Sequence, residues 1–110
     1  MQDNTLHTIL KYPLRIYDTP GRRVLEIDCI SAIPLSVAEQ HGDLTLWALV
    51  EVGYGGKGHQ THVIDVEIYS TGHPIILEDL SSKNFISTVV MQSTPFVWHV
   101  YASEGVARAI

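Results

Sequence analysis

The sequence has little cysteine and no clustered positive charge. Its 110 residues include one cysteine, Cys29, and seven scattered Lys and Arg residues in a chain of formal net charge −5. A single cysteine excludes an intramolecular disulfide and a multi-cysteine zinc site. Without a basic stripe to neutralise phosphates, the chain is not expected to bind duplex nucleic acid.

Long hydrophobic runs are also missing. The start, MQDNTLHTIL, lacks a charged segment followed by an apolar one, so we expect no signal peptide. No apolar run reaches the ~20 residues that span a bilayer, so no membrane partner is expected. Hydrophobic residues nevertheless make up 45 % of the chain and charged residues only 17 %. We therefore expect a soluble, cytoplasmic protein with some apolar surface covered in a homo-oligomer.

The dominant hydrophobic period is two, the period of a β-strand. In HVIDVEIYS, residues 62–70, apolar residues alternate with polar ones, which predicts a strand with one buried face. In TILKYPLRIY, residues 8–17, Pro13 interrupts the pattern and predicts an edge strand or a bulge. The tail EGVARAI, residues 104–110, shows no alternation, and we expect a short helix or a frayed end there.

Turn residues between apolar segments indicate two hairpins. The expected strand pairs are IPLSVAEQ with LTLWALVEV, and FISTVVM with PFVWHVYA. The first pair flanks a short loop in which Gly42 is free to adopt a positive φ. DTPG, residues 18–21, is a further turn signal, and LEDLSS, residues 77–82, has room for one helical turn.

Six or seven short strands with regular turns predict an all-β fold. We expect a small antiparallel sandwich or barrel, formed by residues 1–110 as a single domain with at most one or two short helical turns. The segment LTLWALVEV is apolar on both faces, with Trp47 and Leu49 opposite Leu46 and Ala48. Such a strand lies at the centre of a sheet or under a neighbouring subunit.

Three short motifs suggest chemistry that their context does not support. GYGGKGH has no Ser or Thr after Lys57 and precedes a strand, so it is a β–β loop and not a P-loop. His59 and His62 are three residues apart on an extended segment and point to opposite faces, which argues against a metal pair. Cys29 has apolar strand neighbours and is expected to be a buried, unreactive thiol. We therefore expect no metal, no cofactor and no enzymatic activity.

Aromatic and histidine residues form the more informative set. In PFVWHVYA, Trp98 and His99 point to opposite faces, so His99 faces outward if Trp98 enters the core. In STGHPI, His73 stands beside a glycine in a tight turn, where it either fixes the turn or faces a ligand. The Thr71-Gly72-His73 turn and His99 make a pocket only if the fold brings them together.

Five blocks of the sequence also occur in a known order. LKYPL, LWALV, TGHPI, FISTV and VWHVY follow one another along most of the chain. In this order they resemble a family of short proteins of tailed bacteriophages. The resemblance implies an accessory protein that acts by binding in the cytoplasm of the infected host, either to a host protein or to a nucleotide signal of bacterial immunity.

The leading hypothesis is an anti-defence protein that sequesters a small nucleotide-derived signal without cleaving it. A cyclic ADP-ribose isomer or an ADP-ribose conjugate is the expected ligand class. The basic residues would meet phosphate, the tryptophan would stack on the base, and the turn and imidazoles would hydrogen-bond ribose or phosphate. The expected ligand-binding residues are Lys11, Arg15, Arg22, Trp47, Thr71, Gly72, His73 and His99.

Two alternative functions stay open at this point. One is an accessory protein–protein interaction module that docks through its apolar faces. The other is a phosphodiesterase-like enzyme that cleaves the signal with His73 and His99.

Overall fold

A computed structural model describes residues 5–15, 21–92 and 94–108. The elements are β1 (Thr5–Pro13), β2 (Gly21–Cys29), β3 (Ser31–Gln40), β4 (Asp43–Gly53), η1 (Tyr54–Gly56), β5 (Gln60–Ser70), η2 (Leu77–Leu80), β6 (Asn84–Val90), β7 (Val97–Ala102) and β8 (Val106–Ala107). The predicted all-β class is confirmed, with eight strands instead of six or seven. Within the described ranges, no helix has the length and apolar character needed to cross a membrane.

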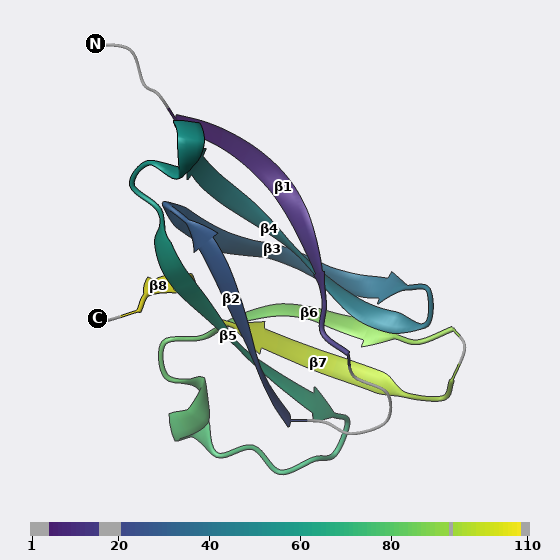
Figure 1. Cartoon of the computed structure of the whole chain (residues 1–110). Helices are drawn as coiled ribbons and strands as arrows, with labels where there is room; N and C mark the ends of the chain where they lie inside the picture. The colour runs from purple at the N-terminus through teal and green to yellow at the C-terminus, as the bar shows by residue number, and fades with distance from the viewer. Residues whose placement is uncertain (1–4, 16–20, 93, 109–110) are drawn as a thin grey trace.

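The strands form two antiparallel sheets that pack face to face as a sandwich (Figure 1). One is three-stranded, in the order β1-β4-β3, and the other is five-stranded, in the order β2-β5-β7-β6 with β8 beside β5. Alternate residues of β4, β5 and β7 enter the shared core because each strand has one inward face. The largest fully buried side chains are Trp98, Leu44, Leu46, Ile64, Ile68, Val50, Val66, Val100 and Cys29.

The chain passes between the sheets through short connections. Only Ile30 separates β2 from β3, and its backbone N–H donates to the carbonyl of Glu51 at 2.8 Å. The loop from β4 to β5 is closed by a bond from Gly53 N–H to His59 Nε2 at 3.0 Å. A Cβ atom at Gly53 would lie 2.2 Å from the Lys57 carbonyl oxygen, so this close approach requires glycine.

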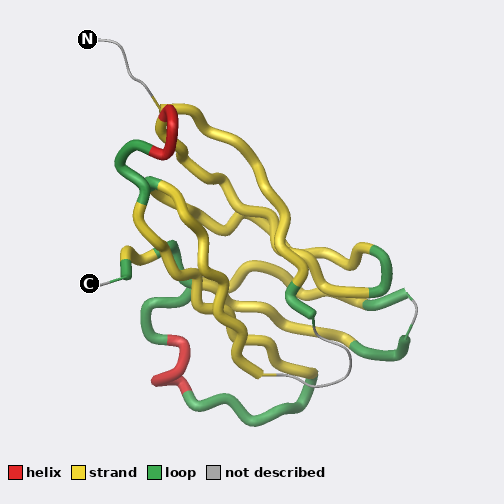
Figure 2. The backbone as a smooth tube through the Cα atoms, in the orientation of Figure 1, coloured by secondary structure: helices red, strands yellow, loops and turns green. Residues whose placement is uncertain are grey.

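Both predicted hairpins are present (Figure 2). Between β3 and β4 the two turn residues, His41 and Gly42, have φ of 53° and 81°, the signature of a type I′ turn. The predicted central position of LTLWALVEV is confirmed, since β4 lies between β1 and β3, and β1 is an edge strand that ends at Pro13. The DTPG turn begins outside the described residues.

The expectation of a helix or a frayed end at residues 104–110 is wrong for the described part, residues 104–108. Val106 and Ala107 form β8 and pair with Val63 and His62 of β5. This segment of β5 would otherwise be an open edge, because β7 pairs with β5 only from Val66 onward. The backbone of the tail fills that edge, and a two-residue strand needs no hydrophobic alternation.

Candidate functional site

The sandwich has two outer faces, and the predicted ligand-binding residues divide between them. In an antiparallel ladder, directly opposite residues have side chains on the same face. Trp98 and its inward neighbours fix which face of the five-stranded sheet is outer. That face, with the turn after β5, carries Arg22, Thr71, Gly72, His73 and His99. Lys11 and Trp47 are directly opposite each other on the outer face of the three-stranded sheet.

His99 is held between two threonine hydroxyls on the outer face of the five-stranded sheet. Its Nε2 lies 2.7 Å from Thr71 Oγ1, and its Nδ1 lies 2.9 Å from Thr88 Oγ1. A neutral imidazole donates from one nitrogen and accepts at the other. Whichever nitrogen carries the proton, at least one threonine accepts a bond from His99 through its hydroxyl oxygen.

The Thr71-Gly72-His73 turn positions one of these hydroxyls. The backbone N–H of His73 donates to the carbonyl of Ser70 at 3.0 Å, which closes a four-residue turn. Gly72 has φ of 85°, and a Cβ atom there would meet no atom within 4 Å. Glycine is therefore needed for the backbone conformation and not for space. The turn directs the Thr71 side chain onto His99.

Aromatic rings cluster beside His99. The Tyr69 ring lies 5.9 Å from the His73 ring, and Tyr101 contacts Tyr69 at 6.2 Å and Phe85 at 5.4 Å edge to face. His99 is directly opposite Tyr69 in the ladder. The structure thus makes both His73 and His99 neighbours of Tyr69. We call this set, with Thr71 and Thr88, the His99 face.

Tyr69 is buried although it points to the outer face. It is 6 % exposed, and its hydroxyl has no hydrogen-bond partner among the described residues. Burial raises the pKa of Tyr69, and the nearby carboxylates Glu67 and Asp79 raise it further, so the hydroxyl stays neutral. The His99 face therefore includes a buried polar atom with an unused hydrogen-bonding capacity.

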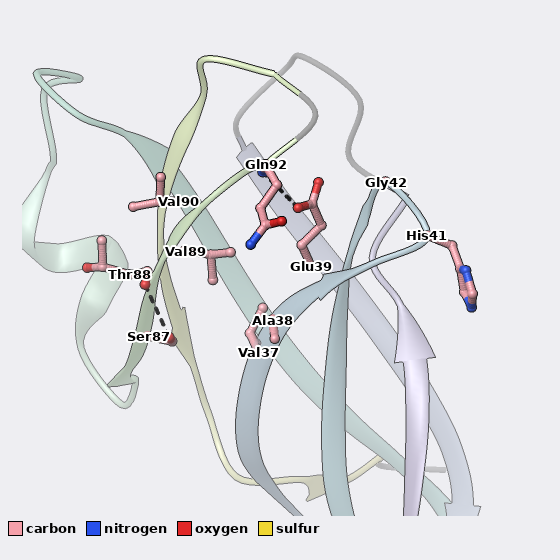
Figure 3. A pocket seen from close by; sticks show the side chains of 10 residues that line it. All are labelled: Val37, Ala38, Glu39, His41, Gly42, Ser87, Thr88, Val89, Val90 and Gln92. Carbon is pink, nitrogen blue, oxygen red and sulfur yellow. Dashed lines mark hydrogen bonds between the residues drawn. The ribbon is translucent and has the colours of Figure 1, made fainter.

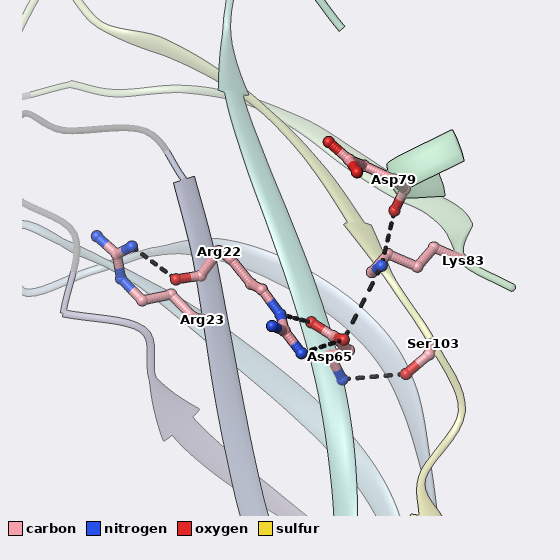
Figure 4. A network of polar contacts seen from close by, with 6 residues as sticks. All are labelled: Arg22, Arg23, Asp65, Asp79, Lys83 and Ser103. Atoms are coloured by element: carbon pink, nitrogen blue, oxygen red, sulfur yellow. Dashed lines mark hydrogen bonds and ion pairs between the residues drawn. The ribbon is translucent and has the colours of Figure 1, made fainter. Parts of the chain in front are cut away.

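Residues 71–83, the cover segment, connect β5 to β6, and Lys83 at their end belongs to a charged network (Figure 4). Lys83 Nζ donates to the Asp79 carbonyl at 2.7 Å and lies 4.0 Å from Asp65 Oδ2. Arg22 makes two bonds to the Asp65 carboxylate, at 2.7 and 2.8 Å. Both cations of the network are therefore already paired with acceptors.

Glu67 gives this network a pH dependence. Burial raises the pKa of Glu67, and although Lys83 lowers it, Asp65 and Asp79 add to the rise. The pKa of Glu67 is therefore higher in the folded protein than in the unfolded chain. As pH rises through the unfolded-state pKa and then the folded-state pKa, the unfolded chain loses its proton more readily, and the free energy of unfolding falls. Replacing Glu67 by Gln should therefore increase the free energy of unfolding more at pH 7 than at pH 4. Urea unfolding at both pH values measures this, with the exposed Glu78→Gln as control. A gain that is equal at the two pH values would contradict the assignment.

The other predicted basic and aromatic residues lie away from the His99 face. Lys11 Nζ donates to Gln40 Oε1 at 3.0 Å, across the outer face of the three-stranded sheet. Arg15 follows β1 with φ of 55°, and its backbone N–H donates to Asp43 Oδ2 at 3.1 Å. Trp47 is half-buried beside Lys11. Within one copy of the chain, these residues cannot share a small ligand with His99.

A groove of about 620 Å³ runs between the β3–β4 hairpin and β6 (Figure 3). Glu39 closes one end, where its Oε1 accepts a bond from the Gln92 backbone N–H at 2.8 Å. His41 lines the hairpin side, and Thr88, which also contacts His99, belongs to the β6 side. The volume is typical of small-molecule sites, but its described lining contains no Phe, Tyr or Trp, and the imidazole of His41 is its one aromatic ring.

His59, His62 and Cys29, the other titratable residues considered from the sequence, contribute to the folded structure and lie outside the His99 face. His59 bonds the Gly53 N–H, whereas His62 is buried on the inner side with its Nδ1 3.0 Å from the Gln60 carbonyl oxygen. No group of three or more metal-ligating side chains occurs in the described part of the chain. Cys29 is buried as predicted, and burial raises the pKa of its thiol.

Sequence reasoning missed Thr88 and Phe85 as parts of the site. Thr88 lies directly opposite His99, and Phe85 directly opposite Tyr101. Alternation in FISTVV does not reveal this pairing, because the register shifts between Phe85 and Ser87. The predicted hairpin of FISTVVM with PFVWHVYA could have pointed to these residues. The turn sequence between the two strands did not fix which residues of the two strands are paired.

Comparison with known proteins gives a family match. The family model described as a domain of unknown function, DUF7352, matches residues 6–109. No curated protein and no solved structure matches this chain.

Proposed function

The chain belongs to the DUF7352 family, a domain of unknown function, and we propose from its site that it binds a small nucleotide-derived ligand on the His99 face without turning it over. One observation carries this proposal: His99 is held by Thr71 and Thr88 beside a cluster of aromatic rings. The arrangement offers hydroxyl and imidazole groups next to ring faces, which suits a molecule made of a base and a sugar.

The ring cluster supports a ligand with an aromatic base. Phe85 is 55 % exposed and Tyr101 is half-buried, so both have surface on which a base can stack. Arg22 is paired with the Asp65 carboxylate and Lys83 with the Asp79 carbonyl, so the positive charge of both is partly neutralised before a ligand binds. Affinity then depends more on stacking and hydrogen bonds than on charge, and inorganic phosphate alone should bind poorly.

Capture without cleavage is supported by the position of the imidazole. Both nitrogens of His99 lie within hydrogen-bonding distance of a threonine hydroxyl, so in this geometry neither is open to a water molecule or a substrate hydroxyl. His73 is exposed and packs against Tyr69. The phosphodiesterase-like alternative is therefore less favoured by this geometry.

The resemblance to short tailed-phage proteins supplies the proposed setting. There the protein sequesters an immune signal of the infected host, such as a cyclic ADP-ribose isomer or an ADP-ribose conjugate, in the cytoplasm. Removal of a signal by binding alone requires a sub-micromolar dissociation constant, which corresponds to a favourable binding free energy of more than ~8 kcal/mol.

Calorimetric titration tests the proposal with cyclic dinucleotides, cyclic ADP-ribose isomers, ADP-ribose conjugates and inorganic phosphate. We expect tight binding of a base-containing compound and its intact recovery by mass spectrometry. His99→Ala and Thr88→Val should each raise the dissociation constant about tenfold or more, because each removes a hydrogen-bonding group of the site.

The matched control is His41→Asn, which changes an exposed histidine of the hairpin and keeps a residue that tolerates positive φ. If His41→Asn weakens binding and His99→Ala does not, the ligand lies in the groove of Figure 3. No binding across the panel contradicts the proposed function, and breakdown of a bound compound replaces it with an enzymatic one.

A further inference from the structure

The outer face of the three-stranded sheet carries an apolar row that is open to water. Ile9, Leu49 and Ile33 are directly opposite one another on β1, β4 and β3. Ile9 is 58 % exposed and Ile33 is 41 % exposed. A row of large apolar side chains across the middle of a sheet face is typical of an interaction surface.

Polar groups of opposite charge lie on the two sides of this row. On one side are His7, Glu51 and Ser31, with Glu51 3.9 Å from His7 and 3.0 Å from the Ser31 hydroxyl. On the other side are Lys11, Trp47 and Ser36. On β1 and β4 each set is two residues from the apolar row, about 7 Å, and on β3 the bulge between Pro34 and Ser36 makes Ser36 the third residue from Ile33.

From this symmetry we propose that a second copy of the chain docks face to face on the three-stranded sheet, with a two-fold axis along the Ile9–Leu49–Ile33 row. The axis brings each apolar side chain against its own counterpart. It also places each β1 on the partner's β1, so Lys11 faces the partner's His7 and lies one strand, about 4.8 Å, from the partner's Glu51, which its long side chain can reach. Lys11 Nζ donates one bond to Gln40 and has two further donors for the partner's carboxylate.

The charges select this axis over the other one available to packed sheets. An axis parallel to the strands would also place the apolar row on itself. It would, however, stack β4 on the partner's β4 with Glu51 against Glu51, and like charges at close range are repulsive. The axis along the row instead puts Lys11 of each copy diagonally beside the partner's Glu51, so unlike charges meet at both ends.

The size of the face predicts a reversible dimer. Three strands about 4.8 Å apart and nine paired positions of about 3.4 Å each give a footprint on the order of 400 Å² per copy. This is at the small end for specific interfaces, which favours a dissociation constant in the micromolar range. The five-stranded sheet points away from this interface, so each copy keeps its own His99 face, and the dimer does not depend on the proposed ligand.

Charge reversal tests the dimer by sedimentation equilibrium. Lys11→Glu sets Glu against Glu51 at both ends of the interface, and Glu51→Lys sets Lys against Lys11. We expect each variant alone to raise the dimer dissociation constant about tenfold. An equimolar mixture of the two variants should restore it as a heterodimer, because each end then pairs Lys with Glu.

An apolar variant tests the row itself. Ile9→Ser should also raise the dissociation constant about tenfold, with little effect on the folded monomer because Ile9 is mostly exposed on an edge strand. Ile76→Ser, at a 66 % exposed isoleucine of the cover segment, is the matched control and should leave the dimer unchanged. The proposal is overturned if the wild type stays monomeric at about 1 mM, if the mixture does not associate, or if the Ile76 variant alone dissociates the dimer.

Discussion

Replacement of Trp98 by alanine is expected to lower the free energy of unfolding by about 3–5 kcal/mol. Trp98 is 1 % exposed on β7 and stacks on Phe96 with ring centroids 5.3 Å apart. Its indole N–H has no hydrogen-bond partner among the described residues, so the loss comes from packing and from the cavity left behind. A small domain has about 5–15 kcal/mol in total, and the variant should therefore be close to unfolding.

The second tryptophan provides a matched control. Trp47 is half-buried on the outer face of the three-stranded sheet. In dilute protein, Trp47→Ala should lower the free energy of unfolding by less than about 2 kcal/mol. Each variant keeps one tryptophan, so intrinsic fluorescence follows urea unfolding of both. An equal decrease in the free energy of unfolding of the two variants would mean that Trp98 is not the centre of the core.

The fold was predictable where alternation and turn residues agree. Buried and partly buried residues alternate throughout β7 and from His62 to Ile68 in β5, so the opposite orientations of Trp98 and His99 followed from the sequence. The type I′ turn at His41 and Gly42 marked the β3–β4 hairpin in the same way. The β8 strand was missed because its two residues pair through backbone atoms alone, which leaves no side-chain pattern.

The candidate site was less predictable because it depends on which sheet each strand joins. Lys11, Trp47 and His99 are all outward residues in their strands, yet they lie on two different faces. The chain changes sheets between β1 and β2, between β2 and β3 and between β4 and β5. At Ile30 it does so across a single residue without a Gly or Pro signal. The contact between Thr71 and His99 likewise depends on the β5–β7 register, which no local sequence pattern encodes.

Unlike the alanine substitution of Trp98, replacement of Tyr69 by phenylalanine is expected to raise the free energy of unfolding, by about 1–3 kcal/mol. The Tyr69 hydroxyl is buried without a partner in the described chain, so its removal relieves a desolvation cost while the ring contacts with His73 and Tyr101 remain. For a domain of this size, 1 kcal/mol corresponds to a melting-temperature rise of roughly 4–8 °C, which thermal unfolding measures readily.

Ligand binding separates a structural from a functional reason for that hydroxyl. If the His99 face binds the ligand as proposed, the ligand supplies the missing hydrogen-bond partner of the Tyr69 hydroxyl. Tyr69→Phe should then weaken binding while it raises the melting temperature. Tyr101→Phe, in the same ring cluster but half-exposed, should change stability little. A lower melting temperature for Tyr69→Phe would mean that the hydroxyl is hydrogen-bonded without ligand. A higher melting temperature with unchanged affinity would remove Tyr69 from the site and leave Thr71, Thr88 and His99 as its polar groups.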